Sequence, residues 1–124
     1  MAPELNEESL DPARARELIA RDGAQVLDLQ EDDDFAAAHI AGAVRADREE
    51  IDAAVESLDE DRPVVVVCED GERSGEVAAE LRERGYQVAV VDGGMKAWTG
   101  DSLPTQPREA EDFHGPRRPG PLGQ

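Results

Sequence analysis

Residues 63–68 read Pro63-Val64-Val65-Val66-Val67-Cys68, the most strand-like segment of the chain. Four consecutive β-branched residues predict a strand that is buried on both faces, as in the middle of a parallel sheet. Shorter apolar runs at residues 25–29 and 88–91 are typical of two further strands. Because segments of helical character separate these runs, the sequence predicts an α/β domain with a parallel sheet.

The expected helices follow from apolar spacing and from capping residues. Asp11 is expected to cap a helix that has Pro12 at its first position and extends to Gly23. After the strand at 63–68, apolar residues at helical spacing predict a helix over residues 74–84, with Gly85 at its end. The remaining expected elements are helices at 32–37 and 49–58, a short strand at 43–45, a turn at Gly93-Gly94 and a helical turn at 95–98.

The charge balance of the chain is strongly acidic. Thirty aspartate and glutamate residues face 13 basic ones among 124 residues, which gives a formal net charge of −17. A field this negative repels nucleic acid and anionic membrane, so we expect neither as a partner. Two explanations remain open. The surface is adapted to high salt, or it attracts a basic partner protein.

Several further function classes are disfavoured by the composition. No apolar run approaches the roughly 20 residues that a membrane-spanning helix needs, and the first residues do not resemble a signal peptide. The single cysteine, Cys68, has no internal disulfide partner, so we expect a reducing, cytoplasmic location. His114 has no companion ligands, and we expect neither a metal nor a cofactor. We expect a structural role for His39.

The candidate site is the loop Cys68-Glu69-Asp70-Gly71-Glu72-Arg73-Ser74, which joins the buried strand to the next helix. Gly71 allows the backbone to curl so that its N–H groups face inward, and such groups favour a bound anion. This arrangement makes Cys68 a candidate nucleophile. Arg73 would add positive charge, and Ser74 is placed to cap the helix. The alternative is that Cys68 is only a small buried apolar residue.

Five segments resemble, in order and at the expected spacing, those of the rhodanese-like family. The resemblance runs from about Leu5 to Pro104. The segments are Asp28-Leu29-Gln30-Glu31 with Asp34-Phe35, Ala38-His39-Ile40-Ala41-Gly42-Ala43, the Cys68–Ser74 loop, Gly93-Gly94-Met95-Lys96-Ala97-Trp98, and Leu103-Pro104.

The resemblance implies a three-layer α/β fold with helices on both faces of a mainly parallel sheet, formed by residues 1–104. Residues 105–124, rich in proline, glycine and charge, are expected to form a flexible tail. The implied activity is sulfurtransferase chemistry in which Cys68 carries a sulfane sulfur as a persulfide. The loop residues Glu69, Asp70, Gly71, Glu72, Arg73 and Ser74 would bind the substrate. The implied partners are a small sulfur-donor anion such as thiosulfate, or a persulfide donor protein, and a thiophilic acceptor.

Loop length and local departures from the family pattern help to distinguish sulfur transfer from other functions. Related phosphatases have five residues between cysteine and arginine, whereas four separate Cys68 from Arg73, so the smaller loop favours sulfur over phosphate. Gln30 stands where the family usually has arginine, so an internal ion pair is missing. The acidic Glu69 should weaken thiosulfate binding. A binding or sulfur-relay module without turnover, and redox sensing by Cys68, therefore stay open as alternatives.

Overall fold

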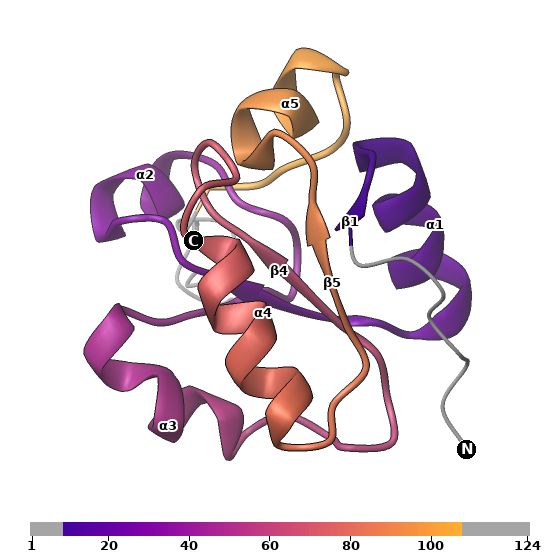
Figure 1. The fold of residues 1–124 in the computed structure, drawn as a ribbon. Coiled ribbons are helices and arrows are strands. Elements are labelled where there is room, and N and C mark those ends of the chain that lie inside the picture. The colour runs from indigo at the N-terminus through magenta and orange to yellow at the C-terminus, as the bar shows by residue number, and fades with distance from the viewer. Residues whose placement is uncertain (1–8, 108–124) are drawn as a thin grey trace, which may run out of the picture.

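The computed structural model describes residues 9–107, and they form one five-stranded sheet (Figure 1). The strand order is β1-β5-β4-β2-β3, and every neighbouring pair is parallel. The strands are β1 (Ser9–Leu10), β2 (Gln25–Asp28), β3 (Val44–Arg45), β4 (Val64–Val67) and β5 (Val88–Val91). The predicted α/β class with a parallel sheet is confirmed. The two-residue strand β1 was not predicted from the sequence.

Helices cover both faces of this sheet. They are α1 (Pro12–Asp22), α2 (Asp32–Ala37), α3 (Ile51–Val55), α4 (Ser74–Glu83) and α5 (Gly94–Gly100), and a 3-10 turn, η1 (Arg48–Glu50), precedes α3. On one face, Val64 and Val66 pack in a cluster with residues of α3 and α4. On the other face, Val65 and Val67 pack with residues of α1 and α5. Successive strand residues point to opposite faces, so four valines in a row supply two separate cores.

Capping explains where the first helix begins and ends. The Asp11 carboxylate accepts a hydrogen bond from the Arg14 N–H at 2.9 Å, and Pro12 occupies the first helical turn. At the other end Gly23 adopts φ 69° and closes the helix with a backbone bond to the Leu18 carbonyl. These predicted caps are confirmed.

Three other predicted helices differ from the structure, and one of them, the helical turn expected at residues 95–98, is the longer helix α5 that begins at Gly94. The helix expected over residues 49–58 is instead the turn η1 followed by the five-residue α3, and the chain then makes a turn at residues 56–57 and a bend at residue 58. Isolated short helices are weak, and this one depends on burying Ile51 and Val55. Helix α4 ends at Glu83, one residue before the predicted end, and Gly85 turns the chain with φ 98°.

The chain after α5 returns to the domain. The Trp98 indole donates a hydrogen bond to the Pro104 carbonyl at 2.9 Å. Gln106 then pairs with His39 as an isolated antiparallel bridge, with backbone hydrogen bonds of 2.8 and 3.0 Å. The predicted domain boundary after residue 104 stays a prediction, and residues 108–124 of the expected tail lie outside the described residues. Within residues 9–107, none of the helices is long and apolar enough to cross a membrane.

Candidate active site

The Cys68–Ser74 loop lies at the carboxyl edge of the sheet, directly after β4. Strand β4 lies between β5 and β2, so the loop starts in the middle of the sheet. In open α/β sheets ligands bind at this edge. Helix α5 holds the loop from above, because the N–H groups of Met95 and Lys96 donate to the carbonyls of Cys68 and Glu69 at 2.8 and 3.0 Å. The loop is therefore supported by backbone contacts with a segment distant in sequence.

The thiol lies inside the curl of this loop. Cys68 is only 1% exposed, and its Sγ accepts a hydrogen bond from the Gly71 N–H at 3.1 Å. Gly71 adopts φ 92°, and a Cβ at that position would lie 3.2 Å from the Gly93 nitrogen. Glycine is therefore required both by the backbone conformation and by the close approach of the turn before α5. The Gly71 N–H has the inward direction that the sequence predicts.

Ser74 does not cap the helix as the sequence analysis expected. It is the first helical residue of α4, is fully buried, and follows Arg73, which occupies the cap position without a side-chain cap bond. The Ser74 hydroxyl donates to the Gly71 carbonyl at 3.3 Å and lies 3.7 Å from Sγ of Cys68. The tight curl of the loop turns this side chain toward the thiol, where it closes the ring.

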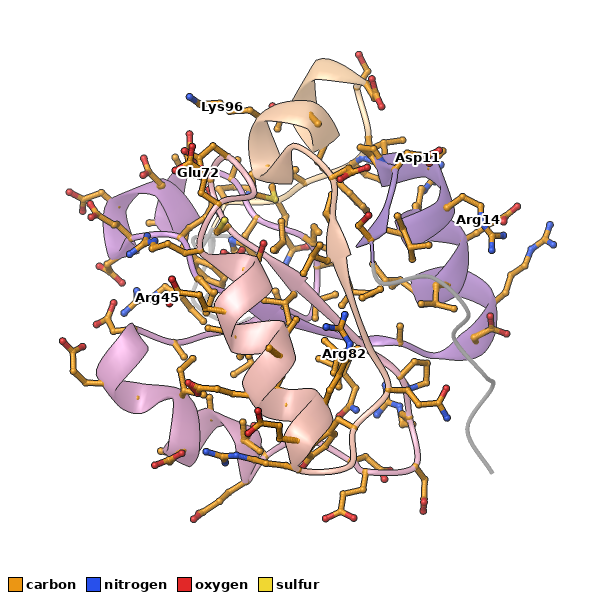
Figure 2. The ribbon with its side chains drawn as sticks, viewed as in Figure 1. Asp11, Arg14, Arg45, Glu72, Arg82 and Lys96 are labelled. Carbon is orange, nitrogen blue, oxygen red and sulfur yellow. The ribbon has the colours of Figure 1, made fainter. Side chains whose placement is uncertain are left out.

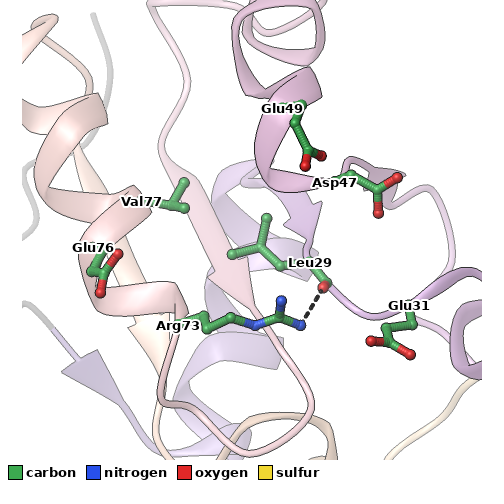
Figure 3. Close-up of a pocket in the computed structure, with 7 residues that line it drawn as sticks. All are labelled: Leu29, Glu31, Asp47, Glu49, Arg73, Glu76 and Val77. Atoms are coloured by element: carbon green, nitrogen blue, oxygen red, sulfur yellow. Dashed lines mark hydrogen bonds between the residues drawn. The ribbon is translucent and has the colours of Figure 1, made fainter.

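Arg73 points away from the loop centre into a cavity of about 580 Å³ between α4 and the segment after β2 (Figure 3). Its guanidinium donates to the Leu29 carbonyl at 3.4 Å. Arg73 therefore ties the loop to the end of β2. The residues that line the cavity are Leu29, Glu31, Asp47, Glu49, Arg73, Glu76 and Val77.

A second, smaller cavity of about 190 Å³ touches the opposite end of the loop at Glu69. It is lined by Gln30, Asp34, Ala38, Glu69, Met95, Lys96 and Thr99. In Figure 2, Glu72 and Lys96 lie at the same end of the molecule as the loop and α5. The Cys68 loop thus lies between two cavities, and among the described side chains the two walls carry six carboxylates, one arginine and one lysine.

A buried carboxylate supports the floor of the site. Asp28 has no exposed surface and accepts hydrogen bonds from the Gln30 backbone N–H at 2.8 Å and the Gln30 side-chain amide at 3.1 Å. The Gln30 amide also donates to the Ala38 carbonyl at 3.2 Å. Burial raises the pKa of Asp28, and the hydrogen bonds from Gln30 oppose that rise. The neutral Gln30 amide thus contacts Asp28 in place of the arginine of the family pattern.

Arg45 is a supporting residue that the sequence analysis missed. Its guanidinium donates to the Gln30 carbonyl at 3.0 Å and to the Asp47 carboxylate at 2.9 Å. This contact lowers the pKa of Asp47. Arg45 and Arg73 thus bind consecutive carbonyls at the end of β2. A lone arginine in a two-residue strand gave no signal in the sequence.

His39 is fully buried. Its Nδ1 lies 2.7 Å from the Phe35 carbonyl, and its ring stacks on Phe35 with centroids 3.8 Å apart. Its backbone pairs with Gln106. These contacts favour the structural role that was expected for His39. Within the described part of the chain, residues 9–107, His, Cys, Asp and Glu do not gather in a group able to hold a metal.

Comparison with known proteins adds a family to this geometry. The sequence profile of the rhodanese-like domain matches residues 11–101. Thiosulfate sulfurtransferase GlpE of Pseudomonas putida is 38% identical over 90 residues, which are 72% of this chain and 82% of that protein. The GlpE protein of Pseudomonas aeruginosa is 36% identical over 88 residues, or 70% of this chain and 79% of that one.

Solved structures agree with the sequence comparisons. A rhodanese-related protein from Thermoplasma volcanium superimposes with a TM-score of 0.73 at 25% identity, covering 80% of this chain and 97% of the other. A thiosulfate sulfurtransferase from Pseudomonas aeruginosa gives a TM-score of 0.75 at 27% identity, over 85% of this chain and 20% of that longer one. With the profile match over residues 11–101, these similarities place the chain in the rhodanese-like domain family.

Proposed function

We propose that this protein moves a sulfane sulfur through a persulfide on Cys68. At family level, relatives named thiosulfate sulfurtransferase support a rhodanese-type sulfurtransferase. The observation that carries the proposal is the Gly71 N–H, which donates to Sγ of Cys68 at 3.1 Å inside a loop at the carboxyl edge of the sheet. A donor aimed at sulfur stabilises the negative charge of a thiolate or a persulfide.

The proposed reaction has two displacement steps. The Cys68 thiolate attacks the outer sulfur of thiosulfate, the S–S bond of thiosulfate breaks, and sulfite leaves with the bonding electron pair. The acceptor, for example cyanide, then attacks the outer sulfur of the persulfide. The new S–S bond breaks, and Cys68 leaves as the thiolate while thiocyanate departs. Each step conserves charge, and the pair of steps needs no cofactor.

The remaining loop residues have supporting roles in this proposal. The backbone of Glu69 through Ser74 would cradle the persulfide, and Arg73 would hold the loop in place through the Leu29 carbonyl. Four residues separate Cys68 from Arg73, one fewer than in related phosphatases, which favours sulfur over a phosphate-sized group. The donor is thiosulfate or a protein persulfide, and the acceptor is thiophilic.

A mass measurement tests the persulfide directly. Purified protein is incubated with thiosulfate in molar KCl and desalted, and its intact mass is measured by mass spectrometry. We expect the wild type to gain the mass of one sulfur atom and to lose it again on addition of cyanide. The Cys68→Ser variant should gain nothing, and its urea unfolding midpoint controls for a folding defect. A Ser variant that still gains sulfur would contradict the proposal.

A sulfur-relay module without turnover is the second candidate. The 1% exposure of Cys68 and the Asp70 carboxylate beside its sulfur favour this candidate, because both slow attack on an anion. It predicts a single stoichiometric sulfur gain from a persulfide donor with no cyanide-coupled turnover on thiosulfate. Sustained turnover on thiosulfate would exclude this second candidate.

A further inference from the structure

The Asp70 carboxylate lies against the reacting sulfur. Sγ of Cys68 lies 4.0 Å from Oδ1 of Asp70. The same Oδ1 accepts the Glu72 N–H at 3.1 Å, a local turn that fixes the carboxylate in place. A sulfur partner that reaches Sγ therefore meets a negative charge held by the backbone of the loop itself.

The two cavities that flank the Cys68 loop carry the same sign of charge. Among the described side chains that line it, the larger cavity has four carboxylates, of which Asp47 is paired with Arg45, and one cation, Arg73, which is bound to the Leu29 carbonyl (Figure 3). The smaller cavity has two carboxylates and Lys96. Charges that line a cleft act together on an approaching ion, so both cavities favour a cation over an anion.

We propose that Asp70 is a specificity-determining residue that selects sulfur partners by charge. Partners with a positive charge close to the sulfur, such as aminothiols, are preferred over neutral thiols, and anionic ones react slowest. This inference rests on the proposed function, because it concerns partners of the Cys68 persulfide. In the discharge step, the acceptor thiolate attacks the outer sulfur of the persulfide, the S–S bond breaks, and Cys68 leaves as the thiolate.

Single-turnover discharge with three small thiols tests this selection. The protein is loaded with inorganic polysulfide, desalted, and mixed with cysteamine, 2-mercaptoethanol or 3-mercaptopropionate at low salt. The remaining persulfide is followed by intact mass, and each rate is divided by the thiolate concentration of the acceptor. The charged groups of cysteamine and 3-mercaptopropionate differ by two charge units. At about 4–5 Å from the Asp70 carboxylate, this difference changes the rate by at least about tenfold in a water-like dielectric. We expect cysteamine to react fastest and 3-mercaptopropionate slowest.

Two charge-matched variants separate Asp70 from the overall field of the protein. Asp70→Asn keeps an oxygen for the Glu72 N–H and removes one charge, and it should reduce the ratio of cysteamine to 3-mercaptopropionate rates several-fold. Asp61→Asn removes one charge from an exposed loop before β4, at the opposite edge of the sheet, and should leave the ratio unchanged. Equal rates for the charged thiols in the wild type, or equal effects of the two variants, would overturn the inference.

A second measurement does not depend on sulfur transfer. Methanethiosulfonates modify a free thiolate directly, forming a mixed disulfide and releasing methanesulfinate. Without polysulfide loading, the trimethylammonioethyl reagent should modify Cys68 at least about tenfold faster than the sulfonatoethyl reagent, and Asp70→Asn should reduce that ratio. If Cys68 does not load sulfur but the cationic reagent still modifies it at least about tenfold faster, the proposed function is refuted and the charge selection is not. Equal modification rates, or no modification by either reagent, would refute the charge selection.

Discussion

At the scale of single residues, Asp28 shows how a departure from the family pattern is accommodated. Its carboxylate has no exposed surface, and the Gln30 amide, which donates to both Asp28 and Ala38, replaces the expected arginine. Arg45 supplies a positive charge nearby and also binds the Gln30 carbonyl. The carboxylate is thus held by neutral donors, with its counter-charge moved to the neighbouring strand.

The raised pKa of Asp28 predicts a pH-dependent cost to stability. Below its ordinary pKa of 3.8 the group is neutral in both states and costs nothing. As the pH rises from 3.8 through the folded-state pKa, the unfolded chain ionises first, and the folded state loses about 1.4 kcal/mol per pKa unit of the rise. Asp28→Asn lacks this loss. The free energy of unfolding of this variant should therefore increase relative to that of the wild type as the pH rises from 4 to 7.

Urea unfolding at several pH values in constant KCl measures this difference. The amide adds a donor that needs a partner, but that contribution is the same at every pH. Asp61→Asn controls for the removal of one negative charge from the chain. If the difference in free energy of unfolding between Asp28→Asn and the wild type stays constant from pH 4 to pH 7, the pKa of the Asp28 carboxyl is not raised in the folded state.

At the scale of elements, the turn before α5 is the contact that holds the Cys68 loop. Gly93 and Gly94 adopt φ 77° and 63°, a conformation that side chains rarely take. A Cβ on Gly94 would collide with the Cys68 carbonyl and would lie 2.7 Å from the Gly71 nitrogen. The sequence predicts a turn here, but the close packing against the loop depends on how β4 and β5 lie side by side.

Gly94→Ala should therefore damage both stability and the site. Strain at positive φ and the collision with the loop together should cost about 3 kcal/mol of unfolding free energy. The loop must also move, so loading of Cys68 with sulfur should slow by at least about tenfold. Chemical unfolding and intact-mass kinetics in molar KCl measure the two effects.

Gly100→Ala is the matched control in the same helix. An added Cβ there meets nothing within 4 Å, so we expect stability within about 1 kcal/mol of the wild type and unchanged loading. Equal behaviour of the two alanine variants would mean that the loop does not depend on the close approach of Gly94.

At the scale of the whole molecule, the net charge of −17 is the dominant feature. At 0.1 M salt the screening length is about 10 Å, and carboxylates across the surface repel one another. At 1 M it falls to about 3 Å, and this repulsion largely disappears. Adaptation to high salt thus remains a prediction of the composition.

Raising KCl from 0.1 to 1 M should stabilise the protein. A gain of about 1 kcal/mol would raise Tm by about 4–8 °C for a domain of this size. Screening is nearly complete by 1 M, so the gain should level off there, whereas solute exclusion continues to grow. Thermal unfolding in a KCl series, with sucrose as an uncharged comparison, tests this. A Tm that does not change with KCl would show that repulsion among the carboxylates has little effect on the stability of the folded protein.

Much of the fold could be predicted because local rules fix it. The valines of β4 are apolar on both faces, so they indicate a central strand, and Asp11 with Gly23 marks the ends of α1. The position of Cys68 at the end of that strand follows directly. Strand β1 gave no such signal, because Ser9-Leu10 contains no β-branched residue, and it pairs with β5 only when the whole sheet forms.

The sequence by itself thus determined the α/β class, the central strand, and a cysteine in a glycine-containing loop at its carboxyl end. Tertiary structure alone decided that Ser74 faces the thiol, that Arg73 binds the Leu29 carbonyl, and that Gly94 touches the loop. The physical reason is the sequence separation over which each effect acts. Propensity and periodicity act over a few residues, whereas these contacts depend on the curl of the loop and on segments as far as 44 residues apart.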